Sequence, residues 1–103
     1  MNVQKLMKEA QRAQKKMAEA QERLASMTVE GTAGGGLVRV TATGDGSVTA
    51  VAIDPSAVDT EDLSLLEDLV TAAVADAQRR SRELQESEMG SAVGGLGGMP
   101  GLF

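Results

Sequence analysis

The fold is decided by residues 34–55, GGGLVRVTATGDGSVTAVAIDP, which predict a β-hairpin. The pair Asp45-Gly46 lies between two runs rich in Val, Thr and Ile, and we interpret it as a two-residue type I′ turn. The second strand ends before Pro55, because proline has no N–H to donate to a sheet and restricts the residue before it.

A two-residue turn fixes which residues of the two strands face each other. The predicted pairs are Thr43 with Val48, Val40 with Val51, and Val38 with Ile53. One face of the sheet then carries Val38, Val40, Val51 and Ile53, and we expect it to form the core. The other face is mixed, with Leu37, Arg39, Thr41, Thr43, Val48, Ala50 and Ala52.

Composition indicates one small domain with little material for a core. The chain has 103 residues, one aromatic residue, no Trp and no Tyr. Such a chain buries a modest share of its surface, so we expect it to oligomerise. Cys and His are absent, which excludes disulfides, thiolate chemistry, histidine metal sites and histidine-dependent nucleophiles.

The remaining chemical groups are carboxylates, Lys, Arg, Ser and Thr, and they form no recognisable catalytic arrangement. We therefore expect no enzyme activity, no cofactor, no metal and no small-molecule substrate. The sequence shows no signal peptide and no apolar run near the length of about 18 residues that a membrane span requires. These features predict a soluble, cytoplasmic protein without a membrane partner.

Residues 2–27 predict a long amphipathic helix, with Asn2 as its N-cap. Apolar residues recur every seven positions, which is typical of a coiled-coil-like seam. The seam carries Val3, Ala10, Met17 and Leu24 at one position and Leu6, Ala13, Ala20 and Met27 at the other. A helix of this length is about 39 Å long, so we expect part of it to project or to pair with another helix.

A first strand is predicted over residues 28–33, followed by a glycine turn at residues 34–36. These glycines lack the GK[ST] ending of a phosphate-binding loop and precede a strand, so a tight turn is the better interpretation. A second long helix is predicted over residues 61–88, with Asp59 or Thr60 as N-cap and Gly90 as its end. Its apolar stripe consists of Leu63, Leu66, Val70, Ala73, Ala77 and Leu84.

The order of elements predicts an α+β fold. We expect a two-layer α-β-β-β-α protomer, in which long N- and C-terminal helices accompany an antiparallel three-stranded sheet. The domain is expected over residues 1–89, with a flexible Gly-rich tail over residues 90–103. The long first helix and the small core favour a symmetric homodimer, formed either by continuing the sheet or by pairing helices across a twofold axis.

The first helix also carries a row of cations opposite its apolar seam. Arg12 lies four residues from both Lys8 and Lys16, and each such like-charge pair costs a helix about 0.2–0.5 kcal/mol. Cations early in a helix also oppose its dipole. The row therefore predicts an anionic partner, although the net charge of the chain is −5. Its members are Lys5, Lys8, Arg12, Lys15 and Lys16.

Double-stranded DNA suits this row, because a duplex carries one charge per about 1.7 Å. Further candidates on the second helix are Arg79, Arg80 and Arg82, although Glu83 and Glu86 are possible local partners for Arg79 and Arg82. No helix-turn-helix, zinc finger or aromatic stacking motif accompanies the cations. We therefore expect phosphate contacts and DNA shape to dominate recognition.

A second interpretation stays open at this stage. The chain is then a protein-interaction module, in which the seam of the first helix packs against a partner and the basic row meets an acidic protein. This interpretation predicts that Met17→Asp abolishes partner binding even where the dimer persists.

Several segments together form a specific pattern, although none is specific alone. They are Gly34-Gly35-Gly36-Leu37-Val38-Arg39-Val40, Gly44-Asp45-Gly46, Ile53-Asp54-Pro55, Leu66-Glu67-Asp68-Leu69-Val70 with Ala73, and Gly97-Gly98-Met99-Pro100-Gly101. With them the chain resembles the YbaB/EbfC family of small bacterial nucleoid-associated proteins. The resemblance implies an α-β-β-β-α homodimer with protruding, tweezer-like helices, acting as a DNA-binding and gene-regulating protein of the cytoplasmic nucleoid. It implies no catalytic motif.

Overall fold

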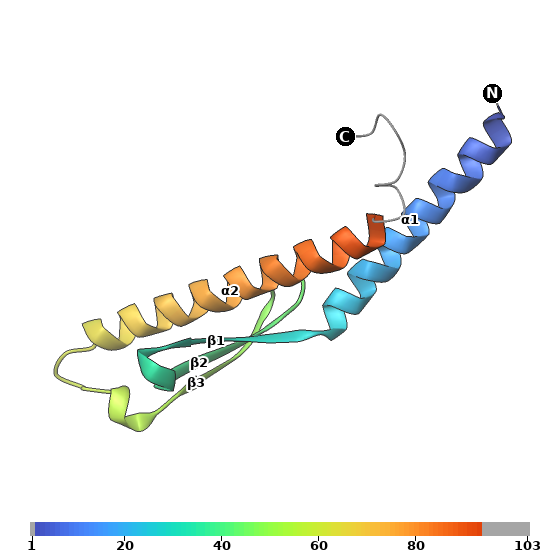
Figure 1. Cartoon of the computed structure of the whole chain (residues 1–103). Helices are drawn as coiled ribbons and strands as arrows, with labels where there is room; N and C mark the ends of the chain where they lie inside the picture. Colours follow the sequence, from blue (N-terminus) through green and yellow to red (C-terminus); the bar gives the residue numbers. More distant parts are fainter. Residues whose placement is uncertain (1, 94–103) are drawn as a thin grey trace.

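The computed structural model describes residues 2–93, and there the elements follow in the predicted order (Figure 1). The helices are α1 (Val3–Ser26) and α2 (Ser64–Val93). The strands are β1 (Thr28–Ala33), β2 (Val38–Thr43) and β3 (Val48–Ile53). Two short 3-10 turns, η1 (Gly34–Gly36) and η2 (Pro55–Ala57), follow β1 and β3. The α+β prediction of helix, three antiparallel strands and helix is therefore confirmed.

The sheet has the order β1-β2-β3, and both pairs of neighbours are antiparallel. Helix α2 lies along one face of the sheet, where it packs against β1 and β2 (Figure 1). A helix is about 10 Å across and strands are about 4.8 Å apart, so one helix covers about two strands. All six residues of β3 are consequently exposed.

The core lies between α2 and the two covered strands. Val38, Val40 and Ala42 of β2 are buried against Ala73 and Ala77 of α2. Among the described residues, only three of the buried apolar side chains are larger than Ala, namely Leu24, Val38 and Val40. The core is therefore as small as the composition indicated.

The hairpin register is confirmed at two of the three predicted pairs, Val38 with Ile53 and Val40 with Val51. The third pair is wrong, because Val48 lies opposite Ala42 and not opposite Thr43. An irregularity in the ladder between Thr41 and Ala42 causes the shift. Thr41 pairs with Ala50 and Ala42 pairs with Val48, so Thr49 is an extra residue in β3. Since the side chains of a strand alternate between faces, this extra residue moves Val48 onto the face of Val51 and Ile53.

The turn of the hairpin differs from the predicted type I′ geometry. Type I′ requires positive φ at both central residues, whereas Gly46 has φ 95° and no non-glycine residue of the described chain has positive φ. The N–H of Gly46 donates to the Thr43 carbonyl at 3.0 Å, and the N–H of Thr43 donates to the Ser47 carbonyl at 2.8 Å. The loop therefore consists of three residues, Gly44, Asp45 and Gly46, and ends in a left-handed glycine.

The helix ends were predicted with mixed success. Asn2 is the N-cap of α1, since its Oδ1 accepts the N–H of Lys5 at 3.2 Å. The predicted start of α2 is wrong, because the side chain of Asp59 accepts the N–H of Glu61 in a preceding turn, and the helix begins at Ser64.

The predicted end of α2 is also wrong. The helix continues through Gly90 to Val93. The flexible tail was predicted over residues 90–103. Residues 90–93 instead belong to α2, and residues 94–103 lie outside the described residues.

The molecule is elongated, with extents of 71 × 24 × 16 Å and a radius of gyration of 19.8 Å. A compact chain of this length has a radius of gyration of about 13 Å. The difference arises because the N-terminal turns of α1 extend beyond the end of α2, away from the sheet (Figure 1).

Candidate nucleic-acid interface

Residues 3–16 of α1, called the arm below, have little contact with the rest of the described chain. The buried residues of α1 are Ala20 and Leu24, which lie in its C-terminal half. Within the arm only Glu9 and Ala13 are partly covered, and every other residue is exposed. The arm is therefore held in place by the C-terminal half of its own helix.

All five cations predicted on the first helix lie in the arm and are exposed. In the part of the chain that the structure describes, none of them forms an ion pair with an acid. At 1.5 Å per residue, the row from Lys5 to Lys16 is about 17 Å long. The arm thus presents a row of unpaired positive charge on a projecting helix.

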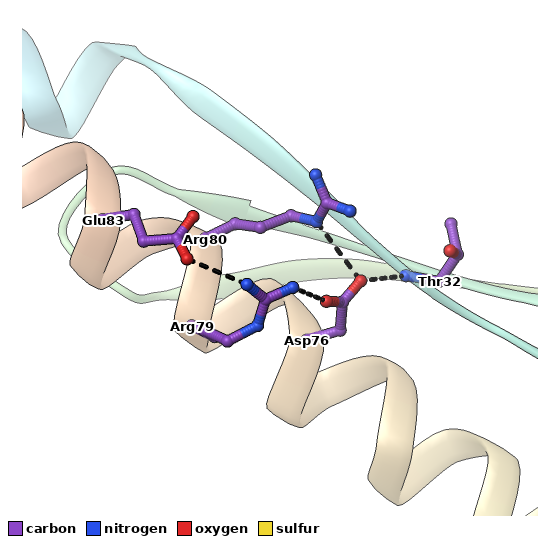
Figure 2. Close-up of polar contacts among 5 residues, drawn as sticks. All are labelled: Thr32, Asp76, Arg79, Arg80 and Glu83. Carbon is purple, nitrogen blue, oxygen red and sulfur yellow. Dashed lines mark hydrogen bonds and ion pairs between the residues drawn. The ribbon is translucent and has the colours of Figure 1, made fainter.

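Two of the predicted cations of α2, Arg79 and Arg80, lie in a different environment (Figure 2). Arg79 forms ion pairs with Asp76 at 2.7 Å and with Glu83 at 2.8 Å. Arg80 contacts the second oxygen of Asp76 at 3.2 Å. Two of the three arginines predicted on α2 are therefore largely balanced by acids of the same helix, and the expected pair between Arg79 and Glu83 is confirmed.

Asp76 is the centre of this network. Its carboxylate accepts the backbone N–H of Thr32 at 3.0 Å, and this hydrogen bond contributes most to lowering the pKa of Asp76 to about 2. The guanidinium groups of Arg79 and Arg80 lower the pKa further. In return, the hydrogen bond to Asp76 raises the pKa of Arg79.

The same contact protects an edge of the sheet. Thr32 lies in β1, which is an edge strand, and its N–H is occupied by a helix side chain. An occupied N–H is unavailable to a strand of another chain. Sequence reasoning missed this role of Asp76, because no local pattern shows that α2 lies over this edge.

Two further arginines lie on the helices. Arg23 of α1 pairs with Glu88 of α2 at 3.1 Å, and this contact ties the two helices together. Arg82 is exposed, and among the described residues it has no ion pair, so the expected contact with Glu86 is not formed. Arg82 is thus the predicted α2 cation whose charge is balanced least by nearby acids.

The uncovered strand β3 presents an apolar surface, called the β3 patch below. Val48, Val51 and Ile53 are 41–46% exposed, although they share a face with the buried Val38 and Val40. The sequence predicted that Val51 and Ile53 are core residues. Within the described chain that prediction is wrong, because α2 is too narrow to reach the third strand.

No group of three or more acidic side chains that could hold a metal ion occurs within residues 2–93. In the same range, neither helix is long and apolar enough to cross a membrane. Two features of the described surface bear on partner binding, namely the cationic arm and the β3 patch.

A model of the YbaB/EbfC DNA-binding family matches residues 1–96. The chain belongs to this family. A relative from Saccharopolyspora erythraea is 50% identical over 98% of this chain and 87% of its own length, and one from Ruminiclostridium cellulolyticum is 44% identical over 99% and 89%. Both carry the name nucleoid-associated protein. The resemblance seen in the sequence is confirmed.

A solved structure has the same fold. The crystal structure of an uncharacterised protein from Helicobacter pylori superimposes with a TM-score of 0.73, over 84% of this chain and 91% of that one. The two sequences are 22% identical. This likeness shows that the α-β-β-β-α arrangement is shared.

Proposed function

We propose that this member of the YbaB/EbfC DNA-binding family binds duplex DNA as a homodimer, with its arms contacting phosphates. We further infer that it associates with the bacterial nucleoid in the cytoplasm, as the names of its relatives suggest, and that DNA binding there influences gene expression. The observation that carries the proposal is the arm itself, since it places five exposed cations on a projecting helix, and none of them has an acidic partner within residues 2–93.

The arm suits phosphate contact better than base reading. Lysine and arginine neutralise phosphates and release condensed counterions, which supplies affinity without sequence information. A dimer presents two arms, which doubles the row. Arg82 adds to this surface, whereas Arg79 and Arg80 contribute less because Asp76 and Glu83 balance their charge.

The β3 patch supports the dimer. Three partly exposed apolar side chains adjoin a core in which few side chains are larger than Ala. A second copy that covers the patch enlarges this core, and in a twofold dimer each chain does so for the other. The opposite edge of the sheet is occupied at Thr32 by Asp76, so the open side of the sheet is at β3.

Oligomeric mass tests the dimer. We expect light scattering to give twice the 10.6 kDa of one chain for the parent protein. Val51→Asp places a charge in the β3 patch and should give the mass of one chain. Ala52→Asp adds the same charge to the other face of the same strand and should leave the dimer intact. A dimer that survives Val51→Asp contradicts the proposed interface.

Two substitutions with the same loss of charge test the arm. Arg12→Gln removes a cation from the arm, and Arg39→Gln removes one from the sheet. Titration of each variant with a labelled duplex should show weaker binding for Arg12→Gln than for Arg39→Gln. Equal affinities for the two variants would exclude the arm as the DNA contact.

One observation favours a second candidate, a protein-binding arm. Val3, Leu6 and Met7 are 47–61% exposed on a helix that has no neighbour there within the described chain. Met17→Asp changes the apolar seam and spares the basic row. If the seam binds a protein, this variant should lose that partner while it stays dimeric, whereas DNA affinity that is unchanged in it supports the phosphate row.

A further inference from the structure

The basic face of α1 changes sign before the helix reaches the sheet. Glu19 follows Lys15 by four residues and Glu22 follows it by seven, so both acids continue the same face. Both are exposed. The face therefore consists of a positive outer part, which is the arm, and a negative inner part next to the body of the protein.

The inner part of α1, residues 17–26, contains one cation, Arg23, and its charge is balanced by an acid of α2. Arg23 lies four residues after Glu19, which is a favourable spacing for a pair within a helix. Its guanidinium instead contacts Glu88 of α2 at 3.1 Å. In the described chain, neither Glu19 nor Glu22 takes part in an ion pair.

The helix dipole does not explain this distribution. The first turn of α1 contains no acid, although acids there stabilise a helix, and its cations lie mostly in the N-terminal half. Glu19 and Glu22 precede the last turn, which carries the cation Arg23, so the helix dipole acts only weakly on them. The N-terminal half of the helix thus carries mostly the charge that the dipole disfavours, and the dipole does not account for the two acids.

We propose that Glu19 and Glu22 set the inner limit of DNA contact on α1, and that they hold the duplex on the arm and away from the body. This inference rests on the proposed binding of DNA by the arm. Phosphates that approach Glu19 or Glu22 meet unpaired carboxylates within a Debye length of about 8–10 Å, where repulsion is only partly screened. The row of cations that remains is about 17 Å long, about half a helical turn of DNA.

The test compares two double variants with the same change in net charge. Glu19→Lys/Glu22→Lys extends the basic face toward the body. Glu61→Lys/Asp68→Lys adds the same charge to the segment before α2 and its first turns, at the end of the molecule opposite the N-terminus (Figure 1). Affinity for a duplex of arbitrary sequence is measured over a salt series, after thermal melting has shown that both variants are folded.

The extended face should gain phosphate contacts. We expect the salt slope of Glu19→Lys/Glu22→Lys to be steeper than that of the parent by about 0.9 for each added phosphate, up to about two per arm. The control variant should bind somewhat more tightly, with the slope of the parent. Equal slopes in the two variants overturn the proposed limit while leaving DNA binding intact. A parent that binds no duplex at low salt overturns DNA binding, and the limit with it.

Discussion

At the scale of single residues, Gly31 shows how closely α2 approaches the sheet. A Cβ at this position would lie 2.7 Å from the Ala77 Cα and closer still to backbone atoms of Ala73 and Ala77. Backbone atoms of a packed helix cannot move aside as a flexible side chain can. We therefore expect Gly31→Ala to lower the free energy of unfolding by about 3 kcal/mol, measured by urea denaturation.

The matched control is Gly90→Ala, since Gly90 is exposed in α2 and an added Cβ meets nothing within 4 Å. Alanine has the higher helix propensity, so this variant should be as stable as the parent or more stable by up to about 1 kcal/mol. A similar loss of stability in both variants would show that the close packing at Gly31 is not the cause.

Asp76 gives a prediction about pH. Its pKa lies near 3.8 in the unfolded chain and is lowered to about 2 in the folded protein, so folding favours the ionised form. The resulting stability is complete above pH 3.8 and is lost as the pH falls through about 2. We expect Asp76→Asn to be less stable than the parent at neutral pH and to lose less stability between pH 4 and pH 2.

Thermal melting at a series of pH values measures this difference. Asp62→Asn is the control, because the hydrogen bonds that lower the pKa of Asp62 come from the nearby Ser64 and do not join α2 to the sheet. Parallel pH profiles for the parent and Asp76→Asn would contradict the role assigned to the contact with Thr32.

At the scale of secondary-structure elements, α1 should have two parts of different stability. Ala20 and Leu24 are buried, whereas residues 3–12 have almost no contact with the described body. Helical turns without tertiary contacts open at low free-energy cost. We expect amide hydrogens of the arm to exchange much faster than those of residues 20–26, and added duplex to slow exchange in the arm. Uniform protection along α1 would contradict this division.

The sequence predicted the elements whose signals are local. The seam and Asn2 predicted α1, and the alternation of residues 28–33 predicted β1 with the bounds that are observed. The start of α2 was missed, because Asp59 and Asp62 cap short turns as readily as they cap a helix. The hairpin loop was predicted wrongly, because Gly44-Asp45-Gly46 allows loops of two or three residues. A register that differs by one residue places Val48 on the other face of the sheet.

At the scale of the whole molecule, folding and dimerisation should be coupled. The protomer buries few large side chains and leaves the β3 patch open. Binding of a second folded copy stabilises the native state by mass action, so the melting temperature should rise over a roughly hundredfold increase in protein concentration. Val51→Asp should melt at a lower temperature that does not depend on concentration. A parent whose melting temperature is independent of concentration argues against a coupled dimer.

The candidate site was only partly predictable. The five cations of the arm follow from spacing on one helix, and the structure places all of them on exposed positions. The positive charges of Arg79 and Arg80 are balanced by Asp76. Asp76 is held in place by its hydrogen bond with Thr32, 44 residues away in the sequence. The β3 patch likewise depends on how many strands one helix can cover. Such relations arise from tertiary packing, which local patterns do not contain.

The most direct test of DNA binding by the arm is the salt dependence of affinity for a duplex of arbitrary sequence. The parent is compared with Lys8→Glu/Arg12→Glu/Lys15→Glu, after the variant is shown to be folded and dimeric. Contacts with six to ten phosphates predict that the parent loses about 10³–10⁵ in affinity between about 50 and 200 mM salt, and that the slope flattens in the variant. A slope that is unchanged in the variant, or a parent that does not bind at low salt, would contradict the account.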